Sequence, residues 1–125
     1  MIGPHVGKEL DLMLAGEKVF AAFSDVVPES GEIIEEIIPE QAFAPYVAEG
    51  KFIRIAKDFV DPGDGMVVRY VCFTVPGEEW RAQTYLWIRE QIRSGKMPYD
   101  NACDVIIGRL LGYSEEDIQE FINQF

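Results

Sequence analysis

The sequence predicts an α+β fold, in which a small antiparallel sheet of three or four strands is packed by helices toward the C-terminal end. Two strand-like runs, FIRIAKDFV (52–60) and MVVRYVCFTV (66–75), flank a DPGDG turn and predict a central hairpin over 52–75. Three helical patterns then follow. The chain has 125 residues, about the size of one domain, and no repetitive or linker-like segment. We therefore expect one domain over residues 1–125.

The N-terminal part predicts one helix and one strand. Apolar residues recur at helical spacing between 6 and 14, and Gly16 is suited to end that helix. VFAAF (19–23) predicts a short buried strand. Pro28 and Gly31 then indicate a loop.

The next segment is ambiguous. IIEEII (33–38) fits either a helical turn or a β-branched strand, and Pro39 ends it in both cases. Pro45 lacks the N–H that a continuous helix over 40–49 would use, so we expect two short turns there.

The register of the hairpin follows from charge. A four-residue loop, Pro62 to Gly65, places Asp58 opposite Arg69. A shift by one residue would place Lys57 opposite Arg69, a like-charge pair that is destabilising. The first register is therefore favoured.

Three helices are expected after the hairpin, over 77–94, over 99–111 and from Ser114 onward. Gly95 and Pro98 punctuate the end of the first. Ser114 with Asp117 resembles a capping box.

A helical wheel of 77–94 separates its faces at 100° per residue. Trp80, Trp87, Tyr85, Ile88 and Ile92 define the expected core side. Arg81 falls inside that sector, where it is expected to form a structural ion pair or, less favoured, to hold an anion. Arg89 and Arg93 fall outside it and are expected to be solvated. Leu86 faces away from the core, which predicts cover by a later helix or by a second subunit in a homodimer.

The net charge of −11 limits the partners of the chain, because its field repels nucleic-acid phosphates and anionic membranes. Neither nucleic acid nor a membrane is expected as a partner. Residues 28–64 are the most acidic part, with nine acidic and three basic residues. A basic protein surface would dock there. The contact residues expected for that partner are Glu32, Glu35, Glu36 and Glu40. Leu86 is the contact residue expected for a homodimer.

Cysteine and hydropathy patterns indicate the compartment. Cys72 and Cys103 lie in apolar runs, without a CxxC pattern, and are expected to be free buried thiols in a reducing compartment. The first residues lack the charge and hydropathy pattern of a signal peptide, and no apolar run reaches membrane-spanning length. These patterns predict a cytoplasmic protein.

No metal or cofactor is expected. Asp58, Asp61 and Asp64 do not match the calcium-loop spacing, and aspartate is a favoured turn residue. His5 is the single histidine and lies near the N-terminus, so a zinc site or a histidine catalyst is disfavoured. No glycine-rich phosphate motif is present.

These patterns favour a non-catalytic protein-binding or regulatory domain whose partner has a basic surface. The alternative is a small enzyme or ligand-binding protein that holds an anionic small molecule between the hairpin and the 77–94 helix. In that alternative Arg54, Arg69 and Arg81 bind the anion, and Asp58, Tyr70 or Tyr85 exchanges a proton. Whether the chain is an enzyme is not decided by its sequence, although the absence of a catalytic constellation favours a binding role.

Overall fold

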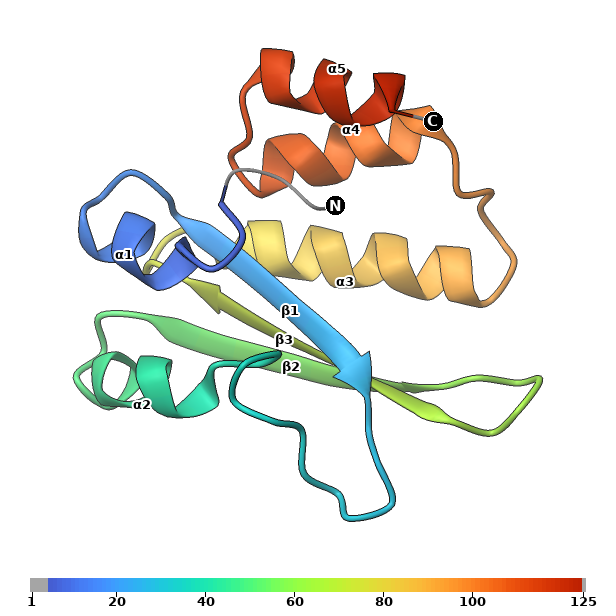
Figure 1. Cartoon of the computed structure of the whole chain (residues 1–125), viewed down its shortest axis with the longest axis horizontal. Helices are drawn as coiled ribbons and strands as arrows, with labels where there is room; N and C mark the ends of the chain where they lie inside the picture. The colour runs from blue at the N-terminus through green and yellow to red at the C-terminus, as the bar shows by residue number, and fades with distance from the viewer. Residues whose placement is uncertain (1–4, 125) are drawn as a thin grey trace.

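A computed structural model describes residues 5–124 as helices arranged around a three-stranded antiparallel sheet (Figure 1). The helices are α1 (Glu9–Leu14), α2 (Glu40–Ala48), α3 (Glu79–Arg93), α4 (Asn101–Leu110) and α5 (Glu115–Asn123). The strands are β1 (Phe20–Val26), β2 (Ile53–Val60) and β3 (Val67–Thr74), in the order β1-β3-β2. The predicted α+β class is confirmed.

The helices cover both faces of the sheet. α3 packs on one face, and α4 and α5 stack outside α3 (Figure 1). Residues of α1 and α2 pack on the other face, where Met13 and Phe43 join Val71 and Phe73. Because side chains alternate along a strand, β3 contributes to a hydrophobic cluster on each face.

The hairpin forms as predicted. Asp58 lies opposite Arg69, and the N–H of Asp61 donates to the carbonyl of Met66, which leaves a four-residue loop. Inside the loop Asp61 Oδ1 accepts from the N–H groups of Gly63 and Asp64. Asp64 Oδ1 likewise accepts from the N–H of Met66, so Asp61 and Asp64 stabilise the turn.

The isoleucine run forms a single helical turn, the first of the two expected alternatives, and not a strand. Residues 35–37 form a turn, in which the carbonyl of Ile34 accepts from the N–H groups of Ile37 and Ile38. Only Ile38 is buried in the core, whereas Ile34 and Ile37 are exposed. One buried side chain is enough to anchor a turn but not to build a helix or strand.

The prediction of two turns over 40–49 is wrong, since α2 continues through Pro45. Phe43 is fully buried and stacks on Phe73 with ring centroids 4.0 Å apart. Pro45 and Gln41 are exposed, so water can satisfy the Gln41 carbonyl that loses its helical donor. Tertiary packing therefore outweighs the local effect of the proline.

The helical wheel of α3 was right for Tyr85 and Ile88, which are buried, and wrong for the two tryptophans. Trp80 and Trp87 are 50% and 55% exposed, whereas Ala82 is buried and Leu86 is only 7% exposed. Leu86 belongs to the same hydrophobic cluster as Ile107 of α4. The later helix α4 covers the side of α3 that carries Ala82 and Leu86. The sequence pattern alone did not show that this side is buried in preference to the side that carries the tryptophans.

The last two helices begin at side-chain caps. Ser114 Oγ accepts from the N–H of Asp117 at 3.1 Å, as the capping pattern predicts, and Asp100 accepts from the N–H of Cys103 at 3.1 Å. Between the helices Gly112 has φ +83°, a conformation that disfavours other residues. This turn presents Leu111 and Tyr113 to the N-terminal part of the chain.

Candidate functional site

The two arginines of the hairpin are each paired with one carboxylate. Arg54 donates to Glu40 at 2.8 and 2.6 Å, and Arg69 donates to Asp58 at 2.8 and 3.0 Å. The Asp58 partner raises the pKa of Arg69, and Arg69 lowers the pKa of Asp58. Both pairs lie on the face of the sheet toward α2 and are partly exposed.

Arg81 has a structural environment on the opposite side of the sheet. Its Nε donates to Glu78 at 2.8 Å, and its Nη1 donates to the carbonyls of Arg109 and Leu110 at the end of α4. Arg81 therefore holds α3 to α4, and it does not join Arg54 and Arg69 in a common pocket.

The expected acidic surface is divided between structural and exposed residues. The Glu35 carboxylate accepts from the N–H groups of Gln41 and Ala42 at 2.9 Å and caps α2. Glu40 is occupied by Arg54. Glu32 and Glu36 are exposed. Leu86 is buried, so the prediction of a dimer contact at this residue is wrong.

A cavity of about 200 Å³ lies beside β1, between α3 and the α4–α5 turn. We call it the Lys18–Arg89 cavity, after its two cationic side chains. The other lining residues are Val6, Glu9, Ala21, Ala22, Ser24, Tyr85, Leu111 and Tyr113. Of the residues predicted to bind a ligand, only Tyr85 lines this cavity. Tyr70 instead accepts a hydrogen bond from Arg93 Nε at 2.9 Å.

Lys18 lies in the cavity wall and is buried, with 4% of its surface exposed. Its Nζ donates to the Leu111 carbonyl and lies 2.9 Å from His5 Nδ1. Burial lowers the pKa of Lys18 from 10.5 to about 8, and Glu9 opposes that change. A protonated amine has three N–H donors, so one is left for a ligand in the cavity.

His5 and Tyr113 hold Lys18 in place. Their rings stack with centroids 4.2 Å apart, and Lys18 Nζ lies 5.2 Å from the centre of the Tyr113 ring. Burial and the nearby Lys18 lower the pKa of His5, which favours the neutral ring. His5 is thus packed against the α4–α5 turn and supports the lysine.

Arg89 supplies the second cation. Its Cζ lies 5.2 Å from the Tyr85 ring centre and 6.0 Å from the Tyr99 ring centre. Burial acts to lower the pKa of Arg89, but Tyr85 and its neighbouring tyrosines outweigh it and the pKa is raised. Nε of Arg89 is buried and has no hydrogen-bond partner within residues 5–124. The expected solvated position of Arg89 is therefore wrong.

The free edge of β1 adds backbone donors. The N–H of Val27 donates to the Val67 carbonyl, and the Val19 carbonyl accepts from the N–H of Val75, so alternate residues of β1 are turned toward β3. Ala22 and Ser24 fall between them, and their backbone N–H and C=O groups point to the free edge. Both residues line the cavity. The N–H of Val26 points the same way and is bonded to its neighbour Asp25.

Sequence reasoning missed Lys18, Arg89 and Tyr113. Lys18 precedes the apolar run VFAAF, a faint signal that a charge adjoins buried chain. Arg89 lies one helical turn after Tyr85, and correct placement of the buried face would have included it. No local pattern relates the α4–α5 turn to residue 18, because 93 residues separate Lys18 from Leu111.

Comparisons with protein-family models, with curated proteins and with solved structures found no match for this chain. Over residues 5–124, each helix is too short or too polar to cross a bilayer. The same residues contain no group of three or more His, Cys, Asp or Glu side chains placed to hold a metal ion.

Proposed function

We propose that this protein binds a small anionic molecule in the Lys18–Arg89 cavity. The observation that carries the proposal is that two cations, the buried Lys18 and the partly buried Arg89, line one cavity, and neither forms an ion pair with a carboxylate among residues 5–124. Removing a charge from water without pairing it is costly, and a bound anion would offset that cost.

The available donors suit an oxyanion. Arg89 offers a free Nε–H, Lys18 a third N–H, and the free edge of β1 the N–H groups of Ala22 and Ser24. Hydrogen bonds from ionised donors to carboxylate or phosphate are stronger than neutral ones. The proposed role is therefore ligand binding. The proposed site is the Lys18–Arg89 cavity and not the hairpin arginines that the sequence analysis considered.

Calorimetric titration with acetate and inorganic phosphate tests this function. We expect saturable binding to the wild-type protein and a loss of about tenfold or more in Arg89→Gln, the effect of one charge-assisted hydrogen bond. Arg93→Gln removes the same charge one helical turn away and should leave the affinity within about twofold. Equal losses in the two variants, or no saturable binding to the wild type, would contradict the proposal.

A second candidate is docking of a basic protein on the acidic surface around Glu32 and Glu36. It is favoured by the exposure of Ile34 and Ile37 in the same segment as these glutamates, because contact surfaces combine apolar and charged groups. Charge reversal of Glu32 and Glu36 should abolish salt-sensitive retention of a partner from the native host. The same reversal at Glu116 and Glu120 on α5 is the control, and equal loss in both pairs would contradict this role.

A further inference from the structure

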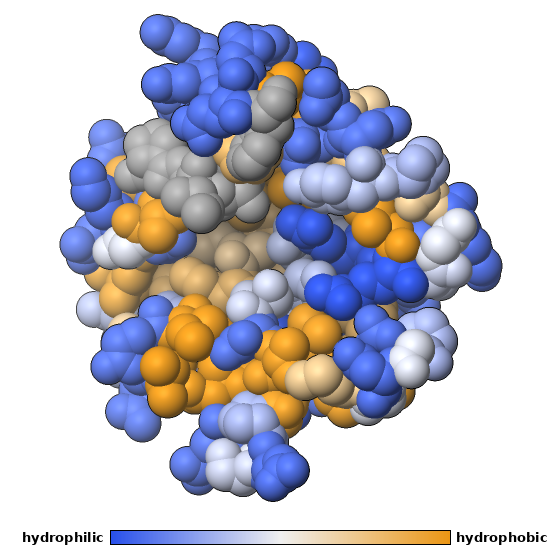
Figure 2. Space-filling model, turned by 45° about the vertical axis from the view of Figure 1, so that its right-hand side comes forward, coloured by the Kyte–Doolittle hydropathy of each residue, from blue (hydrophilic) through white to orange (hydrophobic). Residues whose placement is uncertain are grey.

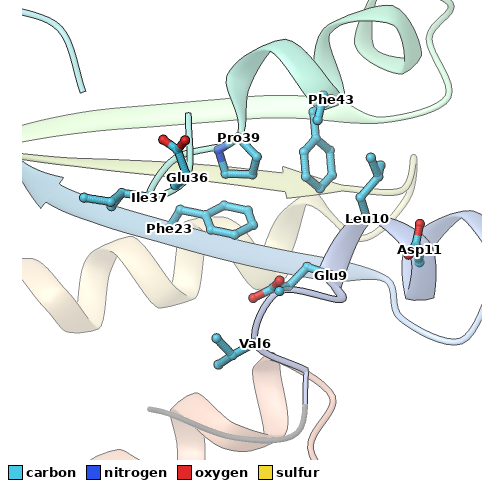
Figure 3. A pocket seen from close by; sticks show the side chains of 11 residues that line it. Val6, Glu9, Leu10, Asp11, Phe23, Glu36, Ile37, Pro39 and Phe43 are labelled. Atoms are coloured by element: carbon cyan, nitrogen blue, oxygen red, sulfur yellow. The ribbon is translucent and has the colours of Figure 1, made fainter. Parts of the chain in front are cut away.

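We infer that the anion is a monocarboxylate with an alkyl chain, and that the chain lies in an apolar groove next to the Lys18–Arg89 cavity. The inference rests on the proposed function, because the cavity is assigned the carboxylate. The groove has a volume of about 390 Å³ and lies between α1, the turn before α2, and α2 itself (Figure 3).

The groove and the cavity adjoin. Val6 and Glu9 line both of them, and in Figure 3 Glu9 lies between Val6 and Phe23. The two spaces lie on opposite faces of β1, since Phe23 packs with the α2 cluster and Ala22 with the α3 cluster. A ligand that passes the N-terminal segment at Val6 can therefore occupy both.

The two spaces differ in chemistry. The groove walls are mainly hydrocarbon, from Leu10, Phe23, Ile37, Pro39 and Phe43, and Phe43 and Leu10 point into the same space (Figure 3). Hydrophobic side chains also gather on the face seen in Figure 2, next to hydrophilic ones. The groove, at about 390 Å³, lies within the usual range of about 300–1,000 Å³ for ligand pockets, and the cavity adds about 200 Å³ beside it.

The charges favour a monoanion. In the cavity two cations, Lys18 and Arg89, face one carboxylate, Glu9, whereas the groove is lined by three carboxylates, Glu9, Asp11 and Glu36. The cavity therefore keeps one surplus positive charge and the groove is acidic, which places the carboxylate of the ligand at the cavity end and its uncharged chain in the groove. An unbranched alkyl chain can pass beside Glu9 while its carboxylate contacts Arg89.

A chain-length series tests the inference. We would titrate the full-length protein with acetate, butyrate, hexanoate and octanoate, and with octanol as the uncharged analogue. Affinity should rise about fourfold for each methylene that enters the groove, and octanol should bind at least tenfold more weakly than octanoate.

Two variants locate the chain. Ile37→Ser should weaken octanoate binding about threefold or more and leave acetate unchanged, because Ile37 lines the groove. Ile34→Ser is the matched control, since Ile34 lies in the same segment, is 59% exposed against 41% for Ile37, and does not line the groove. Far-UV circular dichroism verifies that both variants fold.

The outcomes separate the two proposals. Equal affinity along the series, with Arg89-dependent acetate binding, would overturn the alkyl chain and leave the anion site standing. Octanol binding as tightly as octanoate would overturn the link between groove and cavity. No binding of any carboxylate or of phosphate would overturn both.

Discussion

Lys18 is buried just before β1, where its amine is bonded to the Leu111 carbonyl in the α4–α5 turn and lies beside His5. The bonds satisfy donors but bring no opposite charge within ion-pair distance among the described residues. Desolvation therefore decides the pKa, which falls to about 8. At neutral pH Lys18 is a charged group in a poorly solvated place, which is the property that an anion site requires.

The lowered pKa of Lys18 predicts a pH-dependent contribution to stability. Between pH 8 and 10.5 the unfolded chain binds more protons at this lysine than the folded chain, so the free energy of unfolding should rise with pH. Relative to Lys18→Met, the wild type should gain up to about 3 kcal/mol across this window. Urea denaturation at several pH values measures it.

The comparison with Lys18→Met removes other titrations in the same window. Burial raises the pKa of Cys72 from 9.0 to about 12, which lowers stability above pH 9 in both proteins alike. A difference between the two proteins that stays constant from pH 8 to 10.5 would contradict the buried, desolvated state of Lys18.

Arg81 should contribute measurably to stability. Arg81→Ala removes an ion pair with Glu78 and two hydrogen bonds to the end of α4, with an expected loss of about 1–3 kcal/mol in the free energy of unfolding. Arg109→Ala is the control, since its pair with Glu115 is fully exposed and should matter less. Equal destabilisation would argue against the bridging role of Arg81.

At the scale of elements, α2 depends on a cap from outside the helix. Pro39, at the N-cap, has no side-chain acceptor, and Glu35 supplies one from the preceding turn. We expect Glu35→Ala to lower the free energy of unfolding by about 1 kcal/mol. The neighbouring Glu36→Ala should have a smaller effect in the same thermal-denaturation measurement, and the reverse order would contradict the cap.

The exposed face of α3 has a spectroscopic consequence. Trp80 and Trp87 are half exposed, so native fluorescence should be quenched readily by acrylamide and its maximum should shift little on unfolding. A blue-shifted, protected emission would mean that something covers this face in solution. Light scattering would then distinguish a homodimer from internal cover.

At the scale of the whole molecule, β3 joins the two hydrophobic clusters. Val71 and Phe73 pack on the α2 side, and Tyr70 and Cys72 pack on the α3 side. Neither cluster can persist without the strand between them, so we predict one cooperative transition. Fluorescence from α3 and far-UV circular dichroism should give the same urea midpoint, and separated midpoints would indicate two independent units.

The sequence alone was sufficient for elements that depend on neighbouring residues. The hairpin over 52–75, with Asp58 opposite Arg69, and the cap at Ser114 follow from turn, charge and capping preferences within a few residues. The α+β class followed from the order of these patterns. Each of these features depends on residues close together in the chain, so it can be predicted from the sequence.

Features that depend on packing between distant parts of the chain were decided only by the tertiary structure. It selected Ala82 and Leu86 rather than the tryptophans as the buried side of α3, because α4 returns over them. It carried α2 through Pro45 and placed Lys18 against a turn 93 residues later in the chain. The candidate site belongs to this second group, since burial gives its cations their chemistry and burial is a property of the folded chain.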